Sequence, residues 1–187
     1  NIKDFPKSIV ILGAGVIGCE FATIFSNFGK TKVYLIDKQE RILPFEDEDI
    51  ANVVARNLEE NGVTIHRGAQ LKRMDIVDGQ VEYELTFDDG RNEIYTVEKG
   101  LLSVGRIPNY ETLNLEKAGI HPTDRGYIKD IDTRTEVPHI YAVGDLTADV
   151  ALVNVAELEG RHAAELASGV IESEVSYNNI SSIMFLN

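Results

Sequence analysis

Residues 13–18, Gly13-Ala14-Gly15-Val16-Ile17-Gly18, form a G-x-G-x-x-G pattern whose surroundings decide the fold. The apolar run at residues 9–12, Ile-Val-Ile-Leu, comes directly before it and is typical of a buried parallel strand. A second apolar run at residues 32–36 predicts another strand, which ends at Asp37. The residues between the two strands indicate an amphipathic helix, because their apolar members recur at helical spacing: Ile17, Phe21, Ile24, Phe25 and Phe28. Residues 8–37 therefore predict one βαβ unit.

Each glycine of this pattern has a physical role in dinucleotide binding. Gly13 permits a tight turn, Gly15 lets the backbone approach a pyrophosphate without an intervening Cβ, and Gly18 lets the helix pack closely on the sheet. The diphosphate would meet the unpaired N–H groups at the helix start. A lone G-x-G-x-x-G is a weak signal, but a strand before it and a helix after it are the context that dinucleotide binding requires.

Asp37 favours NAD over NADP. It lies 19 residues after Gly18, at the end of the second predicted strand. Its carboxylate can accept hydrogen bonds from the adenosine ribose hydroxyls, whereas a 2′-phosphate there would meet a like charge. Arg41, in the following loop, could partner such a phosphate and weakens the preference.

The rest of the chain predicts a mixed α/β protein with two or more parts. The acidic run 46–49 is typical of a first helical turn and precedes a second amphipathic helix, which ends at Asn61-Gly62. Three more features are predicted from apolar runs and turn signals: a strand at 63–65, an antiparallel meander within 71–97 and a buried strand at 101–104. Beyond Pro108 the chain is rich in loops, so we place a domain boundary near 106–112, with a strand at 139–143 and a helix from about 152 to 167 following it.

Composition excludes several classes of partner. The 187 residues carry a formal charge of −13, which opposes binding to nucleic acid and to anionic membrane surfaces. Cys19 is the one cysteine, which suits a reducing, cytoplasmic location, and no run of 18 apolar residues predicts a membrane span. We interpret Cys19 as a small buried residue rather than a reactive thiol. The four histidines, His66, His121, His139 and His162, have no metal-ligand spacing, so no metal site is predicted.

The motifs resemble the flavin-dependent pyridine nucleotide-disulfide oxidoreductases, the family that includes dihydrolipoamide dehydrogenase. The resemblance runs through five segments: residues 5–20, 41–44, 102–109, 137–145 and 156–160. It implies a Rossmann-like βαβ sheet with an antiparallel β-meander insertion, followed by part of an FAD-binding domain. The implied domains are an NAD-binding domain at 1–108, a second segment of the FAD domain at 109–176, and the start of a dimerisation domain at 177–187.

The resemblance also assigns cofactor-binding residues. NAD would lie on residues 13–18 and Asp37, with Glu20 near the nicotinamide, Leu71 beside the adenine and Gly105 against the cofactor. Asp145 would bind the flavin ribitol. Four residues would lie beneath the isoalloxazine: Ala151, Leu152, Val153 and Asn154. Many family members have a histidine where this chain has Asn154.

The implied activity is hydride transfer between NAD(H) and FAD and on to a disulfide such as that of lipoamide, in a homodimeric parent enzyme. The family's redox cysteine pair, its first FAD half-domain and its His-Glu acid-base pair are not in this sequence, so we expect no catalytic residue here and interpret the chain as part of a larger enzyme. The alternatives are a soluble pyridine nucleotide transhydrogenase, another flavin reductase, and a non-catalytic NAD-binding module.

Overall fold

The computed structural model describes residues 3–148 and 150–186. The chain divides into two compact units. Unit 1 consists of Asn1–Val104 together with Met184–Asn187, and unit 2 consists of Gly105–Ile183.

Unit 1 is built on a four-stranded parallel sheet in the order β3-β2-β1-β7. Its strands are β1 (Ser8–Leu12), β2 (Lys32–Ile36), β3 (Thr64–His66) and β7 (Lys99–Leu102). Helix α1 (Val16–Asn27) connects β1 to β2, and α2 (Glu48–Glu60) connects β2 to β3. The predicted βαβ unit is confirmed, and with it the predicted mixed α/β fold.

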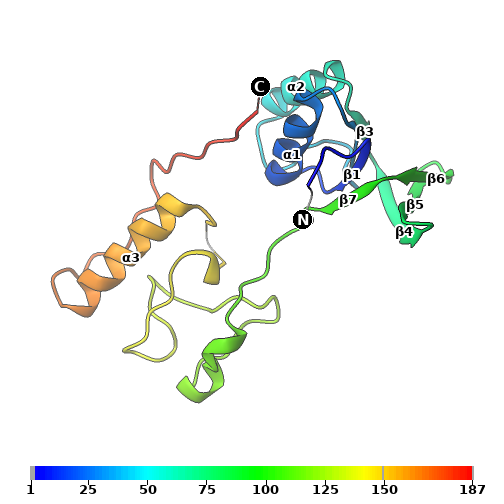
Figure 1. Ribbon diagram of the computed structural model, residues 1–187. Coiled ribbons are helices and arrows are strands. Elements are labelled where there is room, and N and C mark those ends of the chain that lie inside the picture. The colour runs from blue at the N-terminus through cyan, green and yellow to red at the C-terminus, as the bar shows by residue number, and fades with distance from the viewer. Residues whose placement is uncertain (1–2, 149, 187) are drawn as a thin grey trace. The chain divides into compact units, whose positions relative to one another are not determined.

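The two faces of this sheet are covered differently. Ile9 and Ile11 of β1 lie in one apolar core with residues of α1 and α2, so both helices cover the same face (Figure 1). Val10, which points to the other face, lies in a second core with Tyr83 and Leu85 of an antiparallel meander. The meander consists of β4 (Ala69–Val77), β5 (Gln80–Phe87) and β6 (Asn92–Val97). Unit 1 therefore has three layers, with the parallel sheet in the middle.

The apolar stripe that indicates α1 is not the face that α1 buries. Four of its five residues are 38–58% exposed, namely Ile17, Phe21, Ile24 and Phe28. The buried face instead consists mostly of small residues such as Gly18, Cys19 and Ala22. A Cβ added at Gly18 would lie 1.9 Å from the carbonyl oxygen of Gly13. The helix approaches the sheet so closely that small side chains, not the large apolar ones, must face it.

Unit 2 has less regular structure. Its described residues form three short 3-10 turns, η1 (Glu111–Leu113), η2 (Leu115–Ala118) and η3 (Gly144–Leu146), and one α-helix, α3 (Val153–Ala167). Its apolar core has three buried residues: Ile120, Ile128 and Ala142. No helix in the described part of either unit is long and apolar enough to cross a membrane.

The strand predicted at residues 139–143 is wrong. Tyr141 forms only an isolated bridge with Arg134, and the segment is otherwise held by single backbone hydrogen bonds such as Ala142 N to Thr133 O, at 2.9 Å. A strand needs a neighbouring strand along its length, and the described residues of unit 2 supply none.

Candidate functional site

The glycine loop of unit 1 lies where the carboxyl ends of the parallel strands meet. Gly13 N donates to Ile36 O of β2 at 2.8 Å. On the other side, Ser103 N donates to Leu12 O at 2.8 Å, and the Ser103 hydroxyl donates to Gly13 O at 3.0 Å. The loop is thus anchored to both neighbours of β1, at the edge where open α/β sheets bind ligands.

The three glycines of the loop meet different surroundings. A Cβ at Gly13, whose φ is +98°, would lie 2.6 Å from Ser103 O, and a Cβ at Gly18 would collide with Gly13 O. Gly15 has an ordinary φ of −75°, and a Cβ there would meet nothing within 4 Å. The fold itself therefore requires Gly13 and Gly18 but not Gly15.

The start of α1 is left uncapped, in contrast to the start of α2. Asp47 caps α2 by accepting hydrogen bonds from Asp49 N at 2.9 Å and Ile50 N at 3.2 Å. Gly15 is the N-cap of α1, and that helix has neither a side-chain cap nor an acidic residue in its first turn. The N–H groups at this helix start are consequently open to an anion.

Asp37 joins the glycine loop to the end of β2. Its Oδ2 accepts a hydrogen bond from Ala14 N at 2.7 Å, and its Oδ1 accepts one from Gln39 N at 2.9 Å. Because a carboxylate has about four lone-pair sites, Asp37 keeps acceptor capacity for a ligand. The guanidinium of Arg41 donates to Glu46 O at 2.9 Å and to Pro44 O at 3.0 Å. Arg41 therefore supports its own loop.

Other residues of unit 1 have structural partners. Glu20 Oε1 accepts a hydrogen bond from Phe185 N at 2.9 Å, and Leu71 of β4 packs against the second core. Cys19 is fully buried, and burial, followed by the charges of Asp37 and Glu20, raises the pKa of its thiol to about 12. Its burial confirms the interpretation of Cys19 as a small buried residue, and the direction of the pKa shift opposes thiolate formation.

In unit 2, Asp145 lies in the η3 turn with its carboxylate exposed. Arg106 Nη2 lies 3.7 Å from Asp145 Oδ2. A cavity of about 240 Å³ brings Asp145 together with Ala151 and Tyr127. Three more of the predicted residues lie at the start of α3. Leu152 is the N-cap residue, and no side chain caps the helix there. Val153 is 79% exposed, and Asn154 Nδ2 donates to Ser181 O at 3.0 Å. Gly105, with φ of +137°, has open space around its Cβ position.

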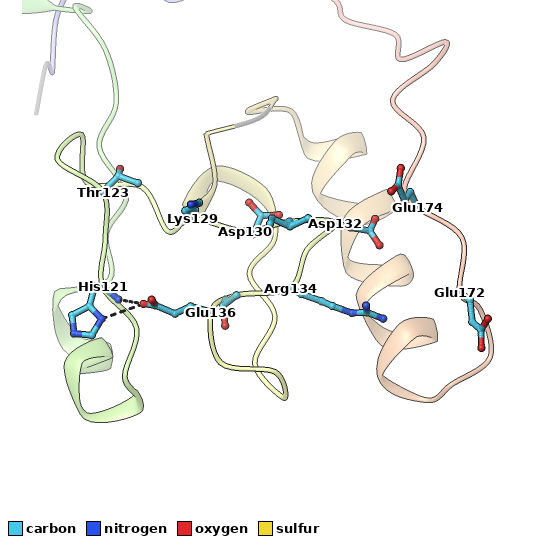
Figure 2. Close-up of a pocket in the computed structure, with 11 residues that line it drawn as sticks. His121, Thr123, Lys129, Asp130, Asp132, Arg134, Glu136, Glu172 and Glu174 are labelled. Carbon is cyan, nitrogen blue, oxygen red and sulfur yellow. Dashed lines mark hydrogen bonds and ion pairs between the residues drawn. The ribbon is translucent and has the colours of Figure 1, made fainter.

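A second cavity of unit 2 lies elsewhere. It measures about 730 Å³, and Figure 2 shows the side chains that line it, several of them acidic. His121 N and Nδ1 both contact Glu136 Oε1, at 2.7 and 3.2 Å. None of the residues predicted to bind a cofactor lines this cavity. In the described residues, no group of three His, Cys, Asp or Glu side chains is arranged to hold a metal ion.

Sequence reasoning assigned no role to three residues that shape these sites. Ser103 anchors the glycine loop, Arg106 faces Asp145, and Glu159 of α3 accepts a hydrogen bond from Gly144 N at 2.6 Å. All three lie in segments that carry the family resemblance, but a segment match does not say which atom a side chain contacts.

Comparisons of sequence and structure relate the chain to known proteins. The family model described as pyridine nucleotide-disulphide oxidoreductase matches residues 1–160. A dihydrolipoyl dehydrogenase of Bacillus subtilis is 38% identical over 170 residues, which is 90% of this chain and 36% of the relative. Among solved structures, LpdA of Mycobacterium tuberculosis superposes with a TM-score of 0.86 at 30% identity, over 99% of this chain and 39% of that protein. The HOCl-induced flavoprotein disulfide reductase RclA of Escherichia coli superposes with a TM-score of 0.83 at 31% identity, over 94% of this chain and 39% of RclA.

The chain thus spans less than two fifths of the length of each of these three proteins. The family match nevertheless covers parts of both units, from the glycine loop of unit 1 to the Asp145 turn and the first half of α3 in unit 2. This chain belongs to the pyridine nucleotide-disulphide oxidoreductase family.

Proposed function

We propose that this chain supplies the NAD(H) site, and part of the flavin site, of a flavoprotein that transfers hydride between NAD(H) and FAD and on to a disulfide. Family membership and the similarity to dihydrolipoyl dehydrogenases support the reaction class. The nicotinamide and the flavin would supply the electron chemistry, and the residues of this chain would bind and orient them.

The open space at Gly15 is the observation that carries the proposal. Gly13 and Gly18 are explained by contacts inside the protein, whereas nothing inside the protein explains a glycine at position 15. A diphosphate lying on the uncapped start of α1 would need this space, and its oxygens would accept hydrogen bonds from the N–H groups there.

Asp37 supports NAD rather than NADP. Its carboxylate accepts hydrogen bonds from Ala14 N and Gln39 N, could accept further ones from ribose hydroxyls, and would repel a 2′-phosphate. Arg41 is engaged with two backbone carbonyls and so does not offset that repulsion.

We further propose that FAD binds to unit 2 only in the longer parent protein. Asp145 and the uncapped start of α3 offer an acceptor and N–H donors. The rest of the flavin site would come from residues outside this chain, since the relatives are more than twice as long.

The test is a titration of the 187-residue chain with NADH, followed by nucleotide fluorescence, for the wild type and Gly15→Ala. We expect the substitution to weaken binding at least tenfold, because its Cβ occupies the diphosphate position. The fold should tolerate it at about 1 kcal/mol or less, the usual scale for an alanine at an N-cap.

Gly160→Ala is the matched control, since Gly160 also has open space at its Cβ position but lies in α3. Equal NADH affinity in wild type and Gly15→Ala would contradict the proposed diphosphate position. NADPH binding as tight as NADH binding would contradict the role given to Asp37.

A further inference from the structure

Helix α3 buries the side chain of a glutamate, Glu159. Glu159 is 1% exposed and forms no ion pair among the described residues. Its Oε2 accepts a hydrogen bond from Gly144 N at 2.6 Å, and its Oε1 accepts one from the Tyr177 hydroxyl at 2.9 Å. A side chain that offers two acceptor oxygens is best suited to this place, because both neighbours donate to it.

Packing alone does not explain a glutamate at this position. Burying a carboxylate without a cation is unfavourable, and a leucine would fill a similar volume without that cost. What a leucine lacks is the ability to accept a hydrogen bond from Gly144 N. The requirement for Glu159 therefore lies in the turn that it contacts.

The contacts of Glu159 complete the immobilisation of Gly144. The carbonyl oxygen of Gly144 accepts from both the N–H and the hydroxyl of Thr147, each at 3.0 Å. The φ of Gly144 is +69°, and a Cβ there would lie 3.0 Å from the Cβ of Ala156, so this turn lies directly on α3. Leu146 O accepts from Ile128 N at 2.8 Å, which fixes the other end of η3.

Asp145 is the residue between these two fixed ends, and its own side chain is exposed. We propose that Glu159, held in place by Tyr177, is a positioning residue that fixes the backbone of η3 and thereby aims the Asp145 carboxylate at the sugar-alcohol hydroxyls of the flavin. This inference rests on the proposed function, because it takes Asp145 as a flavin contact. It adds two residues, Glu159 and Tyr177, that would act on the cofactor without touching it.

The variants separate hydrogen bonding from charge and packing. Glu159→Leu keeps the volume but leaves Gly144 N without its acceptor. Glu159→Gln keeps an oxygen for Gly144 N and can donate from its amide to the Tyr177 oxygen, so it should restore the geometry without the charge. Tyr177→Phe removes one of the two hydrogen bonds to Glu159. Glu157→Leu is the matched control, because Glu157 is an exposed glutamate on the same helix.

The experiment measures the FAD dissociation constant of the full-length parent protein, stripped of flavin and titrated with FAD. We expect Glu159→Leu to raise the constant at least tenfold and Tyr177→Phe about threefold. Glu159→Gln and Glu157→Leu should both stay within twofold of the wild type. If the wild-type parent does not bind FAD, the proposed function fails; if it binds FAD and Glu159→Leu and Tyr177→Phe bind equally well, only this inference fails.

A double-mutant cycle with Asp145→Ala distinguishes positioning from general loosening of unit 2. If Glu159 acts through Asp145, Glu159→Leu should have little further effect once Asp145 is alanine. Fully additive losses would overturn the proposal. Should Glu159→Leu fail to fold, the same cycle with Tyr177→Phe decides the question, because this substitution removes only a hydroxyl group.

Discussion

Unit 1 and unit 2 are stabilised in different ways. The sheet of unit 1 satisfies its backbone polar groups strand by strand, and apolar cores cover both of its faces. Among the described residues of unit 2, the apolar core cluster has three buried members, and α3 buries Val155, Ala163 and Leu166 besides. Its loops are fixed by single backbone hydrogen bonds and by side-chain hydrogen bonds, three of which involve Glu159 and His162 of α3.

Two buried polar residues of α3 form hydrogen bonds that fix these loops. Glu159 holds Gly144, and three residues further along, His162 Nε2 contacts Asp132 Oδ1 at 2.8 Å. The same Asp132 oxygen accepts from Val175 N at 2.7 Å. The comparison teaches that a regular sheet can rely on apolar burial, whereas a unit made of loops needs individual polar contacts to fix its backbone.

The largest difference should come from truncating one core residue in each unit. Ile9→Ala removes a fully buried side chain from the larger core of unit 1 and should lower the free energy of unfolding by about 2–5 kcal/mol. Ile128→Ala, in the small core of unit 2, should cost less than about 2 kcal/mol, since its surroundings can collapse or admit water more easily. Urea unfolding, monitored by hydrogen exchange and mass spectrometry, measures the free energy of unfolding of each unit separately. Equal losses would show that the two cores do not differ as described.

The same contrast explains what the sequence could predict. The βαβ unit, the meander and the glycine loop follow from local periodicity, turn residues and spacing, so residues 8–37 were predicted with nearly correct bounds. The buried face of α1 was not predictable from apolar residues, because the close approach of the helix selects Gly18, Cys19 and Ala22.

In unit 2 the predictable part is smaller. Apolar residues at 139–143 have the composition of a strand, but a strand depends on a distant neighbour that local sequence does not specify. The sequence shows a glutamate at position 159, within the segment 156–160 that resembles the family. Its hydrogen bond with Gly144, 15 residues away, can be recognised only in the folded structure. Residues 13–18 and Asp37 come together at the glycine loop, and Ala151 lies with Asp145 in one cavity, whereas Leu71 packs against the second core. The binding roles of all the predicted cofactor residues stay predictions.

A smaller effect is expected from removing one polar contact in each unit. Asp132→Ala leaves Val175 N and His162 without their acceptor, and its backbone φ of 53° disfavours alanine, so it should cost unit 2 about 2 kcal/mol. Asp47→Ala removes the α2 cap of unit 1 and should cost about 1 kcal/mol. Segment-resolved hydrogen exchange measures both. If Asp47→Ala proved the more damaging of the two, polar contacts would not be the distinguishing support of unit 2.

The smallest effect lies in the response to acid, because it depends on one partly exposed group in each unit. In unit 1, burial lowers the pKa of His66 below its ordinary 6.5, although the charge of Glu93 acts in the opposite direction. In unit 2, burial alone would raise the pKa of Asp132, but the hydrogen bonds from Val175 N and His162 outweigh it and lower the pKa below 3.8. In both cases the unfolded chain binds the proton more readily than the folded chain, so each contribution is present above the unfolded pKa and is lost as the pH falls from there towards the folded pKa.

The better-packed unit should therefore be the first to lose stability on mild acidification. Between pH 7.5 and 5 the free energy of unfolding of unit 1 should fall, because that range crosses the unfolded pKa of histidine, while the contribution of Asp132 to unit 2 stays constant until the pH approaches 3.8. Hydrogen exchange, corrected for the intrinsic rate at each pH, measures the two units in one sample. His66→Phe keeps an aromatic ring beside Tyr34 and Tyr95 and should abolish the fall in the free energy of unfolding of unit 1. Asp132→Asn should leave the pH dependence of that free energy unchanged in both units over this range. A fall in unit 1 that persists in His66→Phe would assign the pH response to another group and remove this difference between the units.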